Sequence, residues 1–176
     1  MDIENDWLEN TQVVGWNGGT IHRVRHDIRD WLPPRTEYRI VFAFPPCNNL
    51  ATSGARWFKD KGLAGLASAI ELVEKARDIC EWADAPWMIE NPMSTLSTYW
   101  RKPDYTFHPW MYGDNYTKKT CLWTGDGFKM PPPDTQDPPD DVDVDYIHKQ
   151  PDSKGRQKKR SLTPAGFARA VYEANK

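Results

Sequence analysis

The sequence predicts an α/β fold, with a Rossmann-like, mostly parallel sheet flanked by helices, in one domain over residues 1–176. Two observations carry this prediction. Continuous apolar runs at Tyr38–Phe44 and Pro86–Ile89 are typical of strands buried on both faces. Between them, Leu63–Ala83 repeats its apolar residues with a helical period. A strand, a helix and a second strand in this order form the βαβ unit of a parallel sheet.

The chain before this unit predicts only short elements. Met1–Asn10 is acidic and polar, and a glycine-containing turn follows at Trp16–Gly19. Thr20–Arg25 predicts a strand, and Pro33 with Pro34 stops any helix before the apolar run. The N-terminal segment therefore adds little to the predicted core.

Three elements are predicted after the unit. A turn at Gly113–Asn115 precedes a strand at Cys121–Trp123. The last element is a helix over Leu162–Asn175, in which Thr163 suits the N-cap and Pro164 the first helical position.

Composition bounds the function classes. The 176 residues are 39% hydrophobic, which is enough for a core and indicates neither a disordered chain nor a membrane span. The net charge of −2 argues against a basic DNA-binding module, although charge is unevenly placed. Asp134–Asp145 is acidic within an irregular, proline-rich loop at about 131–150, and Lys154–Arg160 is basic. That basic cluster suits either phosphate contacts or an ordinary solvated loop.

The aromatic content is high, with nine Trp, seven Tyr and six Phe. Such residues favour core or interface packing, and stacking on bases is the alternative. No segment reads as a membrane span, a signal peptide or a transit peptide. The three cysteines, Cys47, Cys80 and Cys121, form no CxxC pair, so neither a metal site nor a disulfide framework is predicted. We therefore expect a reduced, cytoplasmic setting.

Cys47 follows Phe-Pro-Pro at the end of the first predicted strand. Pro46 fixes its own φ and extends Pro45, so the strand exits stiffly. A thiol on a rigid rim can act as a nucleophile when its proton is removed. The alternative is a small buried apolar residue, which suits Cys80 and Cys121 better.

Glu90 ends the second predicted strand, and Asn91-Pro92 turns the chain after it. A carboxylic acid beside apolar walls has a raised pKa and can donate a proton at neutral pH. A capping or salt-bridged Glu90 is the alternative. Because ligands of parallel sheets sit beyond the carboxyl ends of the strands, Cys47 and Glu90 are expected on one rim. Together they suit attack of a thiolate at C6 of a pyrimidine, with the acid at N3.

The chain resembles the cytosine-C5 DNA methyltransferases, and in particular short members of that superfamily from bacteriophages. The resemblance runs from about His22 to the C-terminus. It rests on the stretches FPPCNNLATSGARWF, IENP, KPDYTFHPWMYGDNYTKKTCLW and KKRSLTPAGFARAV. The pairing of PPC with ENP at this spacing is its most specific part.

The resemblance implies a role for each matching residue. Cys47 matches the nucleophile and Glu90 its partner at N3 and the amino group of cytosine. The remaining substrate-binding positions fall around the PPC and ENP motifs, in the counterpart of a mobile catalytic loop with a hinge at Gly54, and in a later basic pair. They are Pro46, Asn48, Ser53, Gly54, Arg56, Asn91, Pro92, Lys118 and Lys119.

The resemblance also implies S-adenosylmethionine as cofactor, bound through Asp27, Phe44, Thr163 and Gly166. The glycine-rich cofactor turn of the family is not found, since Gly15–Gly19 lacks a preceding apolar strand. The loop at 131–150 is too short and acidic for a large target-recognition domain. A homodimer or a second subunit that completes the cofactor site is therefore expected, in a bacterial or phage-infected cell.

Three functions stay open. The first is a transferase that modifies C5 of cytosine in DNA. The second is a methyltransferase-derived protein that binds DNA or a partner, such as a defence component, without turnover. The third is an enzyme that acts on free pyrimidine nucleotide. The Cys47 and Glu90 pair favours the first, the missing glycine-rich turn the second, and the negative net charge the third.

Overall fold

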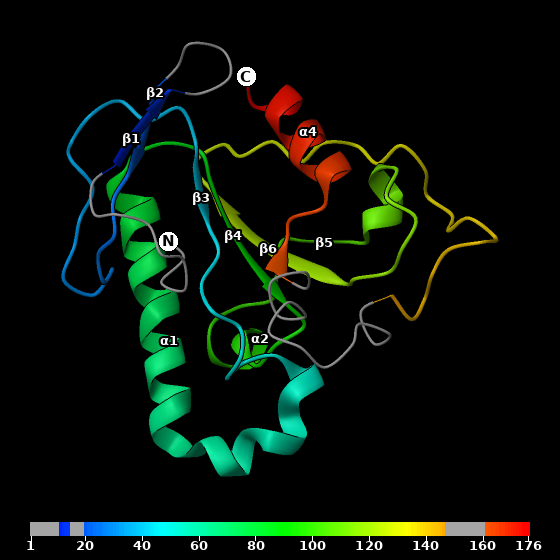
Figure 1. Ribbon diagram of the computed structural model, residues 1–176, viewed down its shortest axis with the longest axis horizontal. Coiled ribbons are helices and arrows are strands. Elements are labelled where there is room, and N and C mark those ends of the chain that lie inside the picture. Colours follow the sequence, from blue (N-terminus) through cyan, green and yellow to red (C-terminus); the bar gives the residue numbers. More distant parts are fainter. Residues whose placement is uncertain (1–10, 15–19, 147–160) are drawn as a thin grey trace.

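The structure is a computed structural model that describes residues 11–14, 20–146 and 161–176. Figure 1 shows a two-stranded sheet set apart from a four-stranded sheet with helices around it. In chain order the elements are β1 (Thr11–Val14), β2 (Thr20–Arg23), β3 (Val41–Ala43), η1 (Thr52–Trp57), α1 (Phe58–Trp82), β4 (Trp87–Pro92), α2 (Leu96–Tyr99), β5 (Tyr105–Phe107), η2 (Pro109–Tyr112), β6 (Thr120–Gly125) and α4 (Ala165–Ala174).

The main sheet has the order β3-β4-β6-β5 and is mixed. Strand β3 pairs with β4 in parallel, whereas β6 is antiparallel to both β4 and β5. The α/β class is thus confirmed, but a mostly parallel sheet is not, because only one of the three pairings is parallel. Parallel neighbours need a long crossover, and in the described chain only the β3–β4 connection contains a long helix.

The predicted βαβ unit is present. Helix α1 connects the two parallel strands and covers one face of the sheet (Figure 1). It begins at Phe58, before the predicted start at Leu63, and contains a bend at Gly62, whose φ is 66° and ψ −178°. This conformation is accessible almost only to glycine. The long straight part of the helix therefore starts after Gly62.

Strand β3 is shorter and more exposed than predicted. Only Val41–Ala43 is paired, and no strand of the described chain pairs with its other edge. Phe42 keeps 42% of its surface exposed and Phe44 keeps 44%. The prediction that this run is buried on both faces is therefore wrong, since an edge strand next to an uncovered face leaves alternate side chains open.

Strand β4 is longer than predicted and includes the ENP motif. Glu90 pairs with Leu122, Asn91 with Cys121 and Pro92 with Thr120 of β6. The predicted turn at Asn91-Pro92 is therefore wrong. The apolar run Trp87–Ile89 ends where predicted, but the backbone pairing continues through the polar residues.

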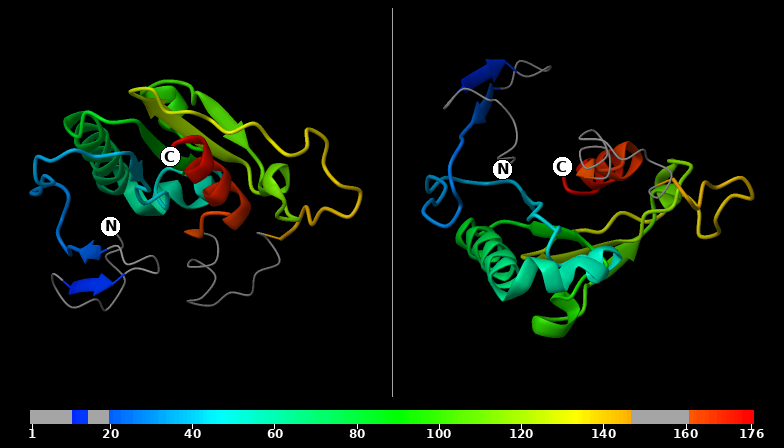
Figure 2. Two further views of the ribbon diagram at one scale, coloured as in Figure 1. Left: turned by 90° about the horizontal axis from the view of Figure 1, so that it is seen from above. Right: turned by 60° about the horizontal axis from the view of Figure 1, so that its bottom comes forward.

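Side chains of β4 and β6 alternate between two cores, one on each face. Under α1, Trp87 and Ile89 pack with Cys121, Trp123, Val73 and Cys80. Under α4, Met88 and Leu122 pack with Phe107, Tyr112 and Phe167. Figure 2 shows α1 and α4 on opposite sides of the sheet. Because successive side chains of a strand point to opposite faces, Glu90 lies on the α4 face with Met88, and Asn91 lies on the α1 face with Ile89.

An aromatic cluster holds α4 on the sheet. The Phe167 ring stacks on Phe107 with centroids 3.9 Å apart and lies edge-on to Tyr112 at 5.2 Å. The helix begins at Ala165, with Pro164 as its N-cap, rather than at Leu162 with a Thr163 cap. Core packing, as predicted for part of the aromatic content, is thereby confirmed for these three rings.

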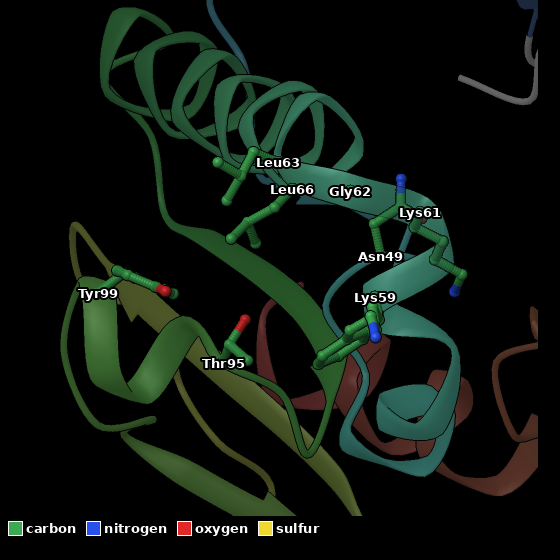
Figure 3. Close-up of a pocket in the computed structure, with 9 residues that line it drawn as sticks. Asn49, Lys59, Lys61, Gly62, Leu63, Leu66, Thr95 and Tyr99 are labelled. Atoms are coloured by element: carbon green, nitrogen blue, oxygen red, sulfur yellow. The ribbon is translucent and has the colours of Figure 1, made fainter.

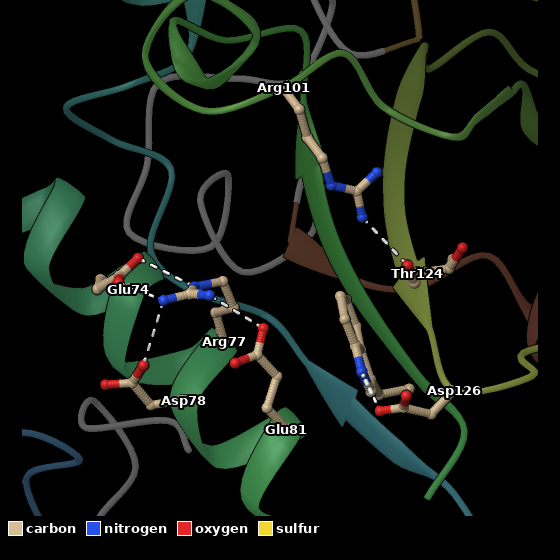
Figure 4. A network of polar contacts seen from close by, with 8 residues as sticks. Glu74, Arg77, Asp78, Glu81, Arg101, Thr124 and Asp126 are labelled. Atoms are coloured by element: carbon tan, nitrogen blue, oxygen red, sulfur yellow. Dashed lines mark hydrogen bonds and ion pairs between the residues drawn. The ribbon is translucent and has the colours of Figure 1, made fainter.

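Polar side chains form contacts at the ends of β4 and β6 and on the surface of α1. The Trp87 indole donates to the Asp126 carboxylate (2.8 Å), and Arg101 donates to the Thr124 carbonyl (3.1 Å) (Figure 4). On the outer side of α1, Arg77 joins three carboxylates, those of Glu74, Asp78 and Glu81. Such exposed ion pairs contribute little to stability, typically about 0–1 kcal/mol.

The remaining described segments are irregular or peripheral. Strands β1 and β2 form an antiparallel hairpin of their own, which was predicted only in its second strand. Residues 131–146 of the predicted loop contain no helix or extended strand, apart from a single bridge between Tyr116 and Asp143. In the described ranges, no helix combines the length and apolar character needed to cross a membrane.

Candidate active site

The PPC and ENP motifs lie side by side in the structure. Because β3 and β4 are parallel neighbours, the chain leaves both strands at the same edge of the sheet. The Asn91 side-chain amide donates to the Pro45 carbonyl at 3.2 Å, which ties the two motifs directly. Asn91 is fully buried, and no described residue donates to its Oδ1 atom. The amide thus fixes where the strand before Cys47 ends.

The loops that follow the two motifs are also joined. Ala51 forms an antiparallel bridge with Ser94, and Thr52 donates through its backbone N (2.9 Å) and its hydroxyl (3.0 Å) to the Met93 carbonyl. In return, the Thr95 amide donates to the Leu50 carbonyl at 3.1 Å. These contacts leave little freedom between the Cys47 loop and the segment after Glu90.

Cys47 opens a tight turn at this edge. Its carbonyl accepts from the amides of Leu50 and Ala51, both at 2.9 Å. The residue is partly exposed and forms no disulfide, whereas Cys80 and Cys121 are buried. Burial raises the pKa of Cys80 to about 12 and also raises that of Cys121. The exposure of the three thiols therefore separates Cys47 from the other two, as the sequence predicted.

Glu90 is a partly buried acid on the α4 face. Burial raises the pKa of its carboxyl, while the positive charge of Lys118 acts in the opposite direction. Lys118 itself donates to the Leu162 carbonyl at 3.2 Å, so the segment before α4 is joined to this region. Lys119 is exposed, and its charge acts on two neighbouring groups rather than on Glu90. Burial is the main cause that lowers the pKa of His108, with the Lys119 charge second, and the same charge opposes the burial that raises the pKa of Cys121. Of the predicted basic pair, Lys118 is thus the one that acts on Glu90.

The predicted catalytic loop forms η1. Ser53 and Arg56 are exposed, and the Arg56 guanidinium lies 5.2 Å from the Trp57 ring centroid. Gly54 donates its amide to the Ala51 carbonyl at 2.9 Å, and a Cβ atom there would meet no described atom closer than 3.8 Å. Its backbone does not require glycine in this conformation, and the hinge role of Gly54 stays a prediction. The position that does require glycine is Gly62.

Pro46 and Asn48 are both exposed on either side of Cys47. The Lys61 ammonium donates to the Asn48 carbonyl, which connects this loop to the bent start of α1. Pro92, by contrast, is partly buried within β4. Pro46 and Asn48, which flank Cys47, are thus exposed, whereas Pro92, two residues after Glu90, is not.

Two of the residues predicted to bind the cofactor have other contacts. Asp27 pairs with Arg29 at 2.8 Å, and Arg29 in turn binds Glu71 (2.9 Å) and the Ser68 hydroxyl (2.8 Å) of α1. The Arg29 backbone amide is the main cause that lowers the pKa of Asp27. Through these contacts, Asp27 and Arg29 attach the segment before β3 to α1. The sequence did not predict this structural role of Asp27.

Gly166 is explained by packing. A Cβ atom there would lie 1.7 Å from the Tyr112 carbonyl oxygen, and its amide donates to the Asp114 carboxylate at 3.0 Å. The residue thus allows the first turn of α4 to approach η2. Of the four predicted cofactor residues, Phe44 and Thr163 remain at least partly exposed. Cofactor binding by these four residues stays a prediction.

Two predicted features, the glycine-rich stretch Gly15–Gly19 and the basic cluster Lys154–Arg160, lie outside the described residues. Within the described ranges, no three metal-ligating side chains come together. Comparison of the chain with protein-family models, curated proteins and solved structures finds no match.

Replacing Gly166 by alanine is expected to lower the free energy of unfolding by about 1–3 kcal/mol, because the added methyl group overlaps a backbone carbonyl. Denaturant unfolding measures the change. Gly54→Ala is the matched control and should stay within about 0.5 kcal/mol, since space is available there. Equal stability of Gly166→Ala and the parent would remove the packing explanation.

Glu90 should make stability fall with rising pH. Its pKa is raised on folding, so the folded state binds more protons than the unfolded state between the ordinary value of 4.5 and the raised value. The free energy of unfolding therefore decreases across that window. Glu90→Gln should remove this decrease and raise stability at neutral pH relative to the parent.

The control for this prediction is Glu74→Gln. Its hydrogen bond to Arg77 lowers the pKa of Glu74, so its contribution is present above the ordinary value and is lost in acid (Figure 4). That variant should lose stability at neutral pH, in the direction opposite to Glu90→Gln. Unfolding curves at about pH 4 and about pH 7 test both signs. Two variants with the same sign would contradict the assigned causes.

Proposed function

We propose that this protein activates C5 of cytosine by covalent addition of the Cys47 thiolate to C6, with Glu90 assisting at N3. The supporting observation is the attachment of the two motifs, in which the Asn91 amide binds the Pro45 carbonyl between neighbouring parallel strands. A partly exposed thiol and an acid with a raised pKa thus come from the same edge of the sheet. The proposed class is a DNA (cytosine-5-)-methyltransferase-like transferase.

The addition itself needs only the Cys47 thiolate, the protonated Glu90 carboxyl and the base. The Cys47 sulfur forms a bond to C6, and the electron pair of the C5–C6 double bond moves into the ring. The protonated Glu90 carboxyl donates its proton to N3, which neutralises the developing charge. C5 is then electron-rich and can take an electrophile. Water then takes the C5 proton, and the electron pair of that C–H bond forms the C5–C6 double bond again and expels the Cys47 thiolate. The N3 proton returns to Glu90.

The raised pKa of Glu90 supports this role. A carboxyl group with an ordinary pKa is ionised at neutral pH and has no proton to donate, whereas burial increases its protonated fraction. The positive charge of Lys118 opposes this rise in the pKa. Matching a catalytic pKa to the working pH is the general requirement of acid catalysis.

Exposed cations beside the site support nucleic acid as the substrate. The exposed cations are Arg56 in η1 and Lys59 at the start of α1, and the exposed hydroxyl group of Ser53 lies in the same stretch after Cys47. In the proposal these groups contact the phosphate backbone of DNA, whose binding is dominated by such contacts. The net charge of −2 makes free pyrimidine nucleotide the alternative substrate.

S-adenosylmethionine is the one-carbon donor that the proposed family uses. Because Asp27 and Gly166 have other contacts, we derive no step through this donor. In the proposal, the fold is a shortened Rossmann-like sheet with β3 at its open edge, and a second copy or another subunit completes the donor site. The proposed setting is the cytoplasm of a bacterial or phage-infected cell.

A methyltransferase-derived protein that binds DNA or a partner without turnover is the second candidate. It is favoured by the contacts of two predicted cofactor residues, because Gly166 packs against Tyr112 and Asp27 pairs with Arg29. The two candidates differ in one property: only the first requires the thiol of Cys47 to add to a base.

Exchange of the C5 hydrogen tests this addition without any donor. When no electrophile is present, the activated C5 takes a proton from water, and reversal of the addition releases the original hydrogen. DNA that carries tritium at C5 of cytosine should therefore lose tritium to water in the presence of the protein. Cys47→Ala should abolish the release, and Cys80→Ala should retain it if that buried position tolerates the change.

The outcomes separate the candidates. Release that depends on Cys47 supports the proposed addition, and labelled S-adenosylmethionine added to the same reaction then tests the donor. Release from free deoxycytidine monophosphate but not from DNA would assign the nucleotide-level reaction. No release by a folded protein from either substrate, with DNA binding retained, would exclude the addition and favour the second candidate.

Glu90→Gln should slow the exchange while leaving substrate affinity nearly unchanged, because the acid acts on the charge that develops during addition. A loss of general acid catalysis is typically a factor of about 100–10,000 in rate. The exchange rate and the concentration for half-maximal rate measure the two effects separately. Equal losses in both would identify Glu90 as a structural residue.

A further inference from the structure

A pocket of about 390 Å³ lies between the bent start of α1 and the short helix α2 (Figure 3). It is on the α1 side of the sheet, whereas Glu90 points to the α4 side. Its lining comes from the Cys47 loop, from both sides of the α1 bend and from the segment after ENP. The residues that the argument uses are Lys59, Lys61, Leu63, Leu66, Thr95 and Tyr99.

The bend at Gly62 creates this pocket. Its φ of 66° turns the chain between Lys61 and Leu63, so the start of α1 no longer continues the axis of the helix. The Asn49 amide donates to the Gly65 carbonyl at 3.1 Å and holds the loop after Cys47 against the first turn that follows the bend. The walls are thus formed by residues whose backbone positions are fixed by described contacts.

The walls expose apolar and aromatic surface. Leu63 keeps 85% of its surface exposed and Tyr99 keeps 60%, and Leu66 lies beside Leu63. Figure 3 shows the Tyr99 side chain on one side of the pocket and the two leucines above it. A flat apolar group that enters the pocket would therefore contact a ring and two branched side chains.

One polar group in the pocket has no partner among the described residues. The Thr95 hydroxyl is buried and makes no hydrogen bond there, and it points up toward Leu66 in Figure 3. A buried hydroxyl without a partner is costly, and native proteins usually satisfy such groups. A hydroxyl can donate or accept, so it suits the polar edge of a ring.

The charge of the lining is positive. Lys59 and Lys61 lie at the end of the pocket opposite Tyr99, and none of the nine lining residues is acidic (Figure 3). The Lys61 ammonium already donates to the Asn48 carbonyl, which leaves its two other hydrogens for a ligand. The lining therefore combines an aromatic end, a central hydroxyl and a cationic end.

We propose that this pocket binds one nucleotide. The base packs against Tyr99 and the leucines, the Thr95 hydroxyl bonds its polar edge, and Lys59 with Lys61 binds the phosphate. The volume falls within the range of about 300–1,000 Å³ of small-molecule sites. The same chemistry is offered by a free nucleoside monophosphate and by an unpaired nucleotide of a DNA strand. The proposal does not depend on the addition of Cys47 to a base.

Calorimetric titration of the full chain with deoxycytidine monophosphate, deoxyadenosine monophosphate and deoxycytidine tests the site. Both monophosphates should bind saturably and more tightly than the nucleoside, which lacks the phosphate. Tyr99→Ala should weaken binding at least about fivefold, since stacking on one aromatic ring contributes about 1–3 kcal/mol per base. Thr95→Val, which keeps the shape of the side chain, should also weaken it.

Matched variants outside the pocket control the result. Tyr105→Ala removes an exposed tyrosine of β5, and Lys102→Gln removes an exposed cation, whereas Lys59→Gln removes a cation of the pocket. Only the last should weaken monophosphate binding. A short single-stranded oligonucleotide titrated in parallel distinguishes the two sources of the nucleotide.

Each outcome decides the proposal. Binding of monophosphates or of the oligonucleotide that Tyr99→Ala weakens and Tyr105→Ala does not supports it. The absence of binding by either ligand to the folded protein overturns it. Binding that Tyr99→Ala and Thr95→Val leave unchanged also overturns it, because the ligand then occupies another place. The exchange reaction of Cys47 is measured separately, so failure here leaves that proposal unaffected.

Discussion

The parallel pairing of β3 with β4 is the contact on which the proposed chemistry depends. It sets the ends of two strands at the same edge, and the Asn91 amide then binds the Pro45 carbonyl across them. The loop that follows Cys47 is attached to the segment that follows ENP, through the contacts of Ala51 with Ser94 and of Thr52 with Met93. Strand β4 is also paired to β6 along its whole length, so the ENP motif is held by a central strand of the sheet.

The sequence predicted this part of the fold because its signals are strong and local. Two apolar runs and one long helical period suffice for a βαβ unit, and this unit sets the segments that carry Cys47 and Glu90 at the same end of the sheet. In the antiparallel half, the strand at Cys121–Trp123 was predicted but its antiparallel pairing was not. Strand β5 was missed because Tyr105–Phe107 is short and shows no clear alternation of apolar and polar residues. The extent of β4 was also missed, since Asn91 and Pro92 disfavour strands locally but are held by pairing with β6.

Roles that depend on distant contacts could not be predicted from the chain. Gly166 matches a cofactor motif in sequence, yet its lack of a side chain is explained by the Tyr112 carbonyl, far away in the sequence. Gly54 and Gly62 show the same limit, because both lie in one polar stretch and only backbone geometry distinguishes them. The sequence does not show which glycine has a positive φ. The bend of α1 at Gly62 and the pocket beside it could therefore not be predicted without the structure.

The environment of Glu90 links stability to the proposed reaction. Among the described residues, none donates a hydrogen bond to its carboxyl, and burial opposes ionisation. An amide or an apolar residue would fill the same place at a lower energetic cost. The register of β4 does not require an acid there, because its neighbours Met88 and Leu122 are apolar and pack without polar groups. A residue that weakens the fold and that packing does not need is expected where chemistry uses it. The buried acid on the α4 face therefore supports the proposed proton transfer to N3 of the base.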